Sequence, residues 1–283
     1  TFHDLGKHDQ AIDCYNKSIS VKRNYDEAYY NRGLAYQSLG KLNMAQADYE
    51  KAYQINPSHI GALTNLGNVF QLMKKYEDAI LCYQKAINLN ANFAQPFNNR
   101  GNLYHELQMY ENALEDYARA LAINPNYSEA LSNRGNTQHA LKKFDEALKS
   151  YDLAINLNSS YVDVRYNRAN LLCELGRFKD AMHDFDKAME INPQFPYLKG
   201  VRLATKMRIC DWENYEKESF DLKDSIINDQ RVSQPFWIFP ISDSLEIQKK
   251  AAQIWVEDKH PQQFGIEITS SRPASRENIK LAY

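Results

Sequence analysis

Apolar residues recur three and four positions apart along most of this chain, in blocks of about a dozen residues separated by short polar turns. In the stretch 60–93 they are Leu63, Leu66, Val69 and Phe70 in a first block and Ala79, Ile80, Tyr83, Ala86 and Ile87 in a second. This spacing is typical of one face of an α-helix and not of the alternation of a strand. The stretch therefore predicts two amphipathic helices with a turn near residues 73–75. A single hairpin of this kind cannot bury both apolar faces and needs neighbours.

The same kinds of residue return when the sequence is shifted by 34 positions. One column is small (Gly33, Gly67, Gly101, Gly135, Ala169), two are alanine (Ala45, Ala79, Ala113, Ala147, Ala181 and Ala52, Ala86, Ala120, Ala154, Ala188), and one is large (Tyr49, Tyr83, Tyr117, Tyr151, Phe185). Proline at positions 57, 125 and 193 is expected to end the second helix of its unit. We expect a half repeat at 1–25 and full repeats at 26–59, 60–93, 94–127, 128–161 and 162–195.

A helix–turn–helix period of 34 residues with these columns resembles the tetratricopeptide repeat, TPR. The resemblance implies an all-α fold, a right-handed superhelix (α-solenoid) whose first helices line the inner, concave surface. An unrelated helical bundle would need no fixed period. Because the sequence starts without a polar capping helix, we expect the array to continue upstream of Thr1.

The composition limits the classes of binding partner and the cellular compartment that we expect. A net charge of −2 gives no overall attraction to nucleic acid or to an anionic membrane. No apolar run approaches the ~20 residues that a membrane span needs, and no signal peptide is visible. The four cysteines, at positions 14, 82, 173 and 210, form no close pair, which favours a cytoplasmic protein with reduced, buried thiols. We therefore expect protein or peptide partners, no nucleic acid and no membrane, and a homodimer is a further possibility.

Two files of asparagine follow the first helices. The first is Asn31, Asn65, Asn99, Asn133 and Asn167, and the second, three residues later, is Asn68, Asn102, Asn136 and Asn170. Residues three apart share a helix face, so the two files lie side by side. Asparagine is a mediocre helix former, and its amide offers both donors and an acceptor that could hold the backbone of an extended peptide. The alternative is that these amides connect adjacent repeats or face water. We favour peptide binding and name these nine asparagines as candidate site residues.

Other candidate chemistry is weak. His105, His139 and Cys173 share one repeat column, but successive repeats lie at least ~8–10 Å apart, whereas a zinc ion needs ligand atoms within ~2.0–2.3 Å of one point. We see no nucleophile–base pair, no glycine-rich phosphate loop and no paired carboxylates. The sequence therefore predicts no metal, no cofactor and no catalytic residue in this chain.

The 34-residue pattern fades after Phe195. Residues 196–232 predict capping or transition helices. The run SQPFWIFP at 233–240 is so rich in aromatic residues that we expect it to be buried. Asp243 with Glu246 resembles a capping box that opens a helix ending near Trp255. A polar linker at 258–277 and a strand at 278–283 would follow, so 233–283 reads as the start of a further domain.

The combination of a TPR array with Cys210–Trp212, the Pro-Phe aromatic segment at 234–244 and the final residues NIKLAY resembles the SPINDLY and O-GlcNAc transferase-like protein glycosyltransferases. The resemblance implies that the strand opens a catalytic domain of the GT-B type that is missing here, which uses UDP-GlcNAc as donor. It also implies that asparagines of the TPR superhelix guide protein substrates. The family's catalytic histidine and donor-binding lysine lie beyond the end of this sequence, so no catalytic residue is transferred. The family's histidine-rich stretch near residues 233–240 is absent, which favours a bacterial-type relative.

Two functions therefore compete. The first is the substrate-recognition scaffold of a protein O-glycosyltransferase that binds extended polypeptide in its groove. The second is a stand-alone TPR adaptor without catalysis, because a fold does not fix a function. A third, a chaperone-type clamp for acidic tails, would need Lys or Arg where the columns hold asparagine. We favour the first because an adaptor has no reason to end on an unpaired strand.

Overall fold

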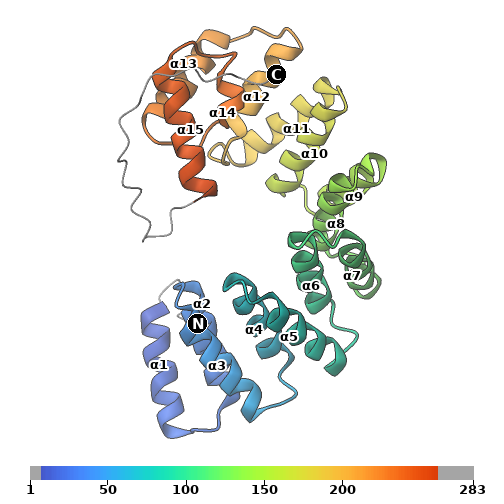
Figure 1. Ribbon diagram of the computed structural model, residues 1–283, viewed down its shortest axis with the longest axis vertical. Coiled ribbons are helices and arrows are strands. Elements are labelled where there is room, and N and C mark those ends of the chain that lie inside the picture. Colours follow the sequence, from blue (N-terminus) through green and yellow to red (C-terminus); the bar gives the residue numbers. More distant parts are fainter. Residues whose placement is uncertain (1–7, 261–283) are drawn as a thin grey trace, which may run out of the picture. The chain divides into compact units, whose positions relative to one another are not determined.

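The structure, a computed structural model, describes residues 8–260 of the chain. It divides into two compact units, Thr1–Ile191 and Asn192–Tyr283. Within the described residues every regular element is a helix (Figure 1). The strand expected at 278–283 and most of the linker expected at 258–277 lie outside these residues, as does the first helix of the expected half repeat.

The first unit consists of helix pairs whose positions follow the 34-residue repeat. Its helices are α1 (His8–Val21), α2 (Asp26–Ser38), α3 (Leu42–Ile55), α4 (Ile60–Leu72), α5 (Tyr76–Leu89), α6 (Ala94–Glu106), α7 (Tyr110–Ile123), α8 (Ser128–Ala140), α9 (Phe144–Leu157), α10 (Val162–Glu174) and α11 (Phe178–Ile191). The turn inside each pair requires a left-handed residue, supplied by Gly40 (φ 69°) and Gly176 (φ 73°) and by Lys74, Gln108 and Lys142 (φ 59° each). Helices α2, α4, α6, α8 and α10 are the first helices of their repeats, and α3, α5, α7, α9 and α11 the second.

The small column allows the two helices of a pair to approach closely, as the sequence predicts. A Cβ atom added to Gly101 would lie 2.7 Å from Cε1 of Tyr117, and one added to Gly135 would lie 2.6 Å from Cε1 of Tyr151. Both tyrosines are at most 1% exposed. In the last repeat Ala169 faces Phe185 in the same columns, and both are fully buried. The aromatic ring therefore occupies the space that the glycine leaves.

Successive repeats meet mainly where the second helix of one repeat packs against the first helix of the next, as α3 does on α4 and α7 on α8, and the first helices also contact one another. Helix α4 contacts both α2 and α6, and α8 contacts both α6 and α10. Among the described helices, no two consecutive second helices make a comparable contact. Because the first helices are the closer set, they lie on the inner side of the curvature of this unit, as expected for a TPR solenoid.

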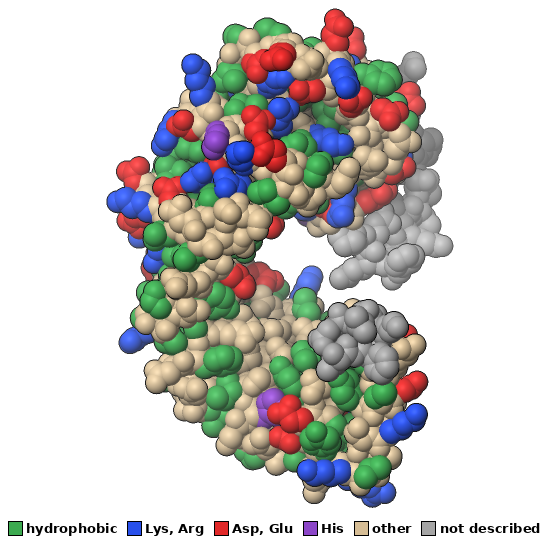
Figure 2. Space-filling view, turned by 180° about the vertical axis from the view of Figure 1, so that it is seen from behind, with side chains coloured by type: hydrophobic (Ala, Val, Ile, Leu, Met, Phe, Trp, Pro, Cys, Tyr) green, Lys and Arg blue, Asp and Glu red, His purple; other side chains and the backbone are tan. Residues whose placement is uncertain are grey.

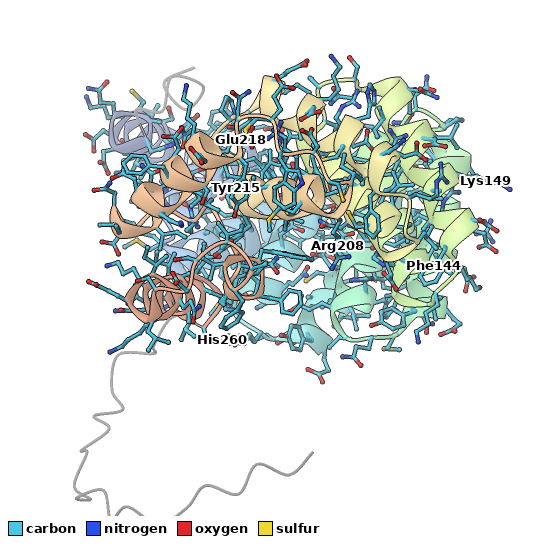
Figure 3. The ribbon with its side chains drawn as sticks, turned by 90° about the horizontal axis from the view of Figure 1, so that it is seen from above. Phe144, Lys149, Arg208, Tyr215, Glu218 and His260 are labelled. Atoms are coloured by element: carbon cyan, nitrogen blue, oxygen red, sulfur yellow. The ribbon has the colours of Figure 1, made fainter. Side chains whose placement is uncertain are left out.

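The second unit contains α12 (Leu198–Arg208), α13 (Tyr215–Ile227), α14 (Pro235–Ile238) and α15 (Leu245–Lys259). Its core consists of Leu203, Leu222, Ile226, Val232, Ile238, Ile241, Ala251 and Ile254. Glu218 of α13, labelled in Figure 3, accepts hydrogen bonds from Arg202 Nη1 at 2.9 Å and Lys206 Nζ at 3.0 Å, and so connects α13 to α12. Asp258, near the end of α15, accepts from Tyr197 Oη at 2.7 Å and from Arg231 Nη1 at 2.5 Å.

Three expectations about side chains were wrong. Phe236 and Phe239 of the aromatic run are 66% and 60% exposed, and of the four large residues only Ile238 is buried. The cap of α15 is Ser244, whose Oγ accepts from the backbone N–H of Ile247, and the helix continues to Lys259. Proline at 235 starts a short helix that turns Ile238 inward and its neighbours outward. Of the thiols, only Cys82 is buried, and Cys14 and Cys210 are exposed.

Candidate functional site

Four of the five asparagines of the first file connect their helix to the preceding repeat. The amide nitrogens of Asn99 and Asn167 donate to Oδ1 of Asn68 at 2.9 Å and Asn136 at 3.0 Å. The other bonds of this file are Asn65 to Tyr30 Oη at 3.2 Å, Asn133 to Asn98 Oδ1 at 3.2 Å, and Asn31 to the Glu27 carbonyl in its own helix at 2.7 Å. Four of the five amides thus form the inter-repeat contacts that the alternative interpretation describes.

The second file is connected to the aromatic column of its own repeat. The hydroxyls of Tyr83, Tyr117 and Tyr151 each donate to the asparagine fifteen positions earlier, at 2.8 Å. These acceptors are Oδ1 of Asn68, Asn102 and Asn136. A tyrosine at +15 is therefore the sequence signal that a mid-helix asparagine has an internal partner. In the last repeat the column holds Phe185, which has no hydroxyl, and Asn170 makes no hydrogen bond to any described residue.

Donor atoms remain available on this face. Among the described residues, the Nδ2 atoms of Asn102, Asn136 and Asn170 have no hydrogen-bond partner, and all three side chains are half-buried. An open groove of about 450 Å³ lies beside Asn102, between α4 and α6. It is lined by Asn68, Gln71, Leu72, Lys74, Asn99, Asn102 and Glu106. The structure therefore brings three of the candidate asparagines to one groove. Whether a peptide binds there stays a prediction.

The charges that line this groove do not favour the binding of a polyanion such as a nucleic acid. Its lining contains one cation, Lys74, and one carboxylate, Glu106, whose oxygens already accept from Gln71 and from Tyr76. The space-filling view shows blue and red side chains interspersed on the face it displays (Figure 2). A nucleic-acid groove would require a run of basic residues.

The histidine column serves the contact between repeats. His105 Nδ1 lies 2.8 Å from Thr137 Oγ1, and His139 Nε2 lies 2.7 Å from Glu174 Oε2, in each case one repeat further along. Burial lowers the pKa of His105. Each ring thus has its own partner in the following helix, and the column does not converge on one point.

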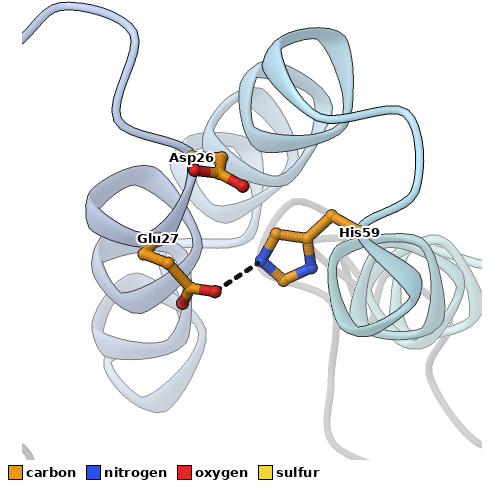
Figure 4. A group of neighbouring side chains, drawn as sticks. All are labelled: Asp26, Glu27 and His59. Atoms are coloured by element: carbon orange, nitrogen blue, oxygen red, sulfur yellow. Dashed lines mark ion pairs between the residues drawn. The ribbon is translucent and has the colours of Figure 1, made fainter.

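A second group of ligand-type side chains lies where α2 begins. Potential ligand atoms of Asp26, Glu27 and His59 lie within 4.8 Å of one another (Figure 4). However, Nδ1 of His59 accepts from the backbone N–H of Ala62 at 3.1 Å, so in the neutral ring the proton is on Nε2. That nitrogen points to Glu27 Oε1 at 3.7 Å and, being protonated, has no lone pair for a metal. Asp26 accepts from Asn56, which lowers its pKa. Helix capping explains the group better than metal binding does.

A column of buried ion pairs escaped the sequence analysis. Arginine precedes aspartate by sixteen positions in three repeats, as Arg32–Asp48, Arg100–Asp116 and Arg168–Asp184. In each, Nε and Nη2 donate to the two carboxylate oxygens at 2.6–2.7 Å. The Arg and Asp columns were readable in the sequence by their own 34-residue period.

Comparison with known proteins agrees with this geometry. The sequence model of the tetratricopeptide repeat matches residues 26–59, 94–127, 128–161 and 162–195, and a second TPR repeat model matches 1–40 and 72–108. These matches cover well over half of the chain. The chain belongs to the tetratricopeptide repeat family.

Solved structures show the same fold. The chain is similar to PilF of Pseudomonas aeruginosa (24% identity, TM-score 0.65, 81% of this chain and 97% of that chain). It is also similar to a tetratricopeptide repeat protein of Parabacteroides merdae (20% identity, TM-score 0.62, 89% and 94%) and to the Cut9–Hcn1 structure of the APC/C (13% identity, TM-score 0.67, 89% and 47%). No curated protein matches the sequence. Among the described residues, no helix is both long and apolar enough to cross a bilayer.

Proposed function

We propose that this chain is a protein–protein interaction scaffold that binds an extended polypeptide along the first helices of its TPR unit. The observation that carries the proposal is the open groove at Asn68, Asn99 and Asn102, together with the unpaired amide donors of Asn102, Asn136 and Asn170. Solenoids present extended inner surfaces of this kind to their partners.

The hydrogen bonds within the repeats assign different roles to the two files. The first file donates to the preceding repeat and so keeps neighbouring helices in register. In the second file Asn102 and Asn136 accept from tyrosine through Oδ1, which fixes the amide and leaves Nδ2 directed away from that bond. A donor held in place loses little entropy on binding. Amides repeated at least ~8–10 Å apart along the first helices can donate to backbone carbonyls about three residues apart in an extended peptide without reading its side chains.

The test replaces the donors and keeps the acceptors. A peptide is first selected on the wild-type chain from a random display library, and its affinity is measured by calorimetry. In the triple variant N102D/N136D/N170D, the new carboxylates still accept from Tyr117 and Tyr151 but cannot donate. Three lost hydrogen bonds at ~0.5–1.5 kcal/mol each predict binding weaker by about tenfold or more.

The control carries the same charge change elsewhere. Asn16, Asn88 and Asn112 are exposed residues of α1, α5 and α7, so N16D/N88D/N112D should bind the peptide as the wild type does. N170A is a second, uncharged probe, because Asn170 has no internal hydrogen bond to lose. Wild-type affinity in the triple variant, with unchanged circular dichroism, would refute peptide holding by the second file.

The glycosyltransferase association is a proposal about a longer protein, and the TPR matches support the adaptor at least as well. It rests on the resemblance of Cys210–Trp212 and residues 234–244. Calorimetry with UDP-GlcNAc should show no binding to this chain and should show binding once the proposed catalytic region follows it. A longer protein that fails to bind any nucleotide sugar would leave the adaptor as the function.

A further inference from the structure

One repeat breaks the pattern of buried ion pairs. At the position of Asp48, Asp116 and Asp184, the repeat 128–161 has Ser150, while its arginine, Arg134, is kept. Arg134 Nε donates to Ser150 Oγ at 3.1 Å, and the serine hydroxyl donates onward to Gln138 Oε1 at 2.6 Å. The guanidinium thus points where the other arginines point, but no carboxylate meets it.

The second partner is missing as well. In the paired repeats Nη1 donates to a polar residue of the preceding second helix, namely Asn16, Gln84 or Asp152. The equivalent residue for Arg134 is Ala118, which is exposed and cannot accept. Among the described residues, Nη1 and Nη2 of Arg134 therefore have no hydrogen-bond partner.

The electrostatics follow from these contacts. Burial lowers the pKa of Arg134, and the one charge that opposes this shift is Glu146. For Arg100 and Arg168, burial acts in the same direction, but the hydrogen bonds and charges of their aspartates outweigh it and the pKa rises. Arg134 is thus the arginine of this column whose charge is half-buried without a bonded anion.

Arg134 is partly exposed to solvent. The equivalent arginines line open grooves on the side of the second helices: Arg100 with Gln84 and Arg119, and Arg168 with Asp152 and His183. At Arg134 the residue equivalent to Gln84 and Asp152 is Ala118, whose side chain is smaller and cannot accept a hydrogen bond from the Nη atoms. A guanidinium with two adjacent free N–H groups matches the two oxygens of a carboxylate or phosphate.

We propose that Arg134 is an oxyanion-binding site that takes a carboxylate or phosphate group through Nη1 and Nη2, in place of the aspartate that its repeat lacks. The site lies on the side of the second helices and is independent of the peptide groove. A bound group would be held by two charge-assisted hydrogen bonds at the Nη1–Nη2 edge of the guanidinium, because Nε is bonded to Ser150; Asp116, by contrast, holds Arg100 through Nε and Nη2.

The experiment observes the arginine directly. The Nε–Hε resonances of the wild-type chain are recorded by ¹⁵N NMR, with Arg134 assigned by its loss in R134K. Sodium acetate and inorganic phosphate are titrated separately, with chloride keeping the ionic strength constant. We expect a saturable shift for Arg134 and none for Arg32, Arg100 or Arg168. A response to acetate alone indicates a carboxylate ligand, and a response to phosphate alone indicates a phosphate ligand.

Three variants make the result specific. S150D restores the aspartate of the other repeats and should weaken the apparent affinity by about tenfold or more. S150N introduces a side chain of about the same volume as aspartate but without its charge, and should keep the anion response of Arg134. K149Q removes the exposed cation next to Ser150 on α9, which is labelled in Figure 3. This variant should also keep the anion response of Arg134.

A fourth variant is supplied by the chain itself. The repeat 60–93 has Leu66 and Cys82 in the same two columns, so R134L/S150C copies a pairing that this fold already contains. It should fold, and its melting temperature should not rise with added anion, whereas that of the wild type is expected to rise. The proposal is overturned if neither anion shifts Arg134 saturably, or if S150D responds as the wild type does.

Discussion

The contact between Gly101 and Tyr117 permits a quantitative prediction. A methyl group at residue 101 would lie 2.7, 3.0 and 3.1 Å from three ring carbons of Tyr117. To reach ordinary contact at 3.4 Å, the ring or the helix must move by about 0.7 Å, the difference from the shortest of these distances. The ring is 1% exposed and its hydroxyl is bonded to Asn102, so it has little freedom to move. Overpacking costs ~1–3 kcal/mol, and the better helix propensity of alanine returns ~1 kcal/mol.

G101A should therefore lower the free energy of unfolding by up to about 2 kcal/mol. Y117F, which removes the hydroxyl bonded to Asn102, should lower it by about 1 kcal/mol. The double variant reproduces Ala169 and Phe185 of the last repeat, where both residues are fully buried. Without its hydrogen bond the ring can shift, so the double variant should lose less than the sum by at least about 0.5 kcal/mol.

The assay is urea unfolding followed by far-UV circular dichroism. The control is Y117F alone with glycine retained, which separates the lost hydrogen bond from the steric contact. Strictly additive effects, or a G101A variant more stable than the wild type, would refute the idea that the missing side chain makes room for the ring.

Two further predictions follow from the environments of single groups. Burial raises the pKa of the Cys82 thiol to about 11, so at pH 8 it should react with a disulfide reagent far more slowly than exposed Cys14 and Cys210, and equal rates would contradict this. Hydrogen bonds from Arg231, Tyr197 and Lys259 hold the pKa of Asp258 well below its usual range. A depressed carboxylate pKa stabilises the fold above the unfolded-state value of ~3.9, and the contribution is lost as the pH falls through the folded-state pKa. D258N should therefore lower the melting temperature of the second unit at pH 7 and remove this acid dependence, whereas an unchanged pH profile would contradict it.

The TPR repeat could be predicted from the sequence because the packing requirements that define it involve residues close in the chain and recur in every repeat. Close packing of helices requires a small residue at the column of Gly101 and a large one at the column of Tyr117, and the 34-residue period displays both. The prediction that the aromatic run at 233–240 is buried was wrong because residue type alone does not indicate which side of a short helix faces the core. Proline 235 sets that orientation, with Ile238 inward and Phe236 outward.

The candidate site was only partly readable. The asparagine files were visible, but their partners are contributed by other helices: Asn99 bonds to Asn68 in the preceding repeat, and Asn102 to Tyr117 in its own. Such contacts depend on how neighbouring helices are aligned along their axes, and the residues on the face of one helix do not indicate this alignment. Arg134 escaped notice because its distinguishing feature is an aspartate that is absent from its column.

The central claim is that amide donors on the first helices hold the backbone of a bound polypeptide. The most direct measurement is the side-chain amide region of a ¹⁵N NMR spectrum, recorded as a selected peptide is added to saturation. The account predicts shifts in the Nδ2 resonances of Asn102, Asn136 and Asn170 and none at Asn16, Asn88 and Asn112 on the other helices. A saturated complex in which the first three resonances stay unmoved would contradict it.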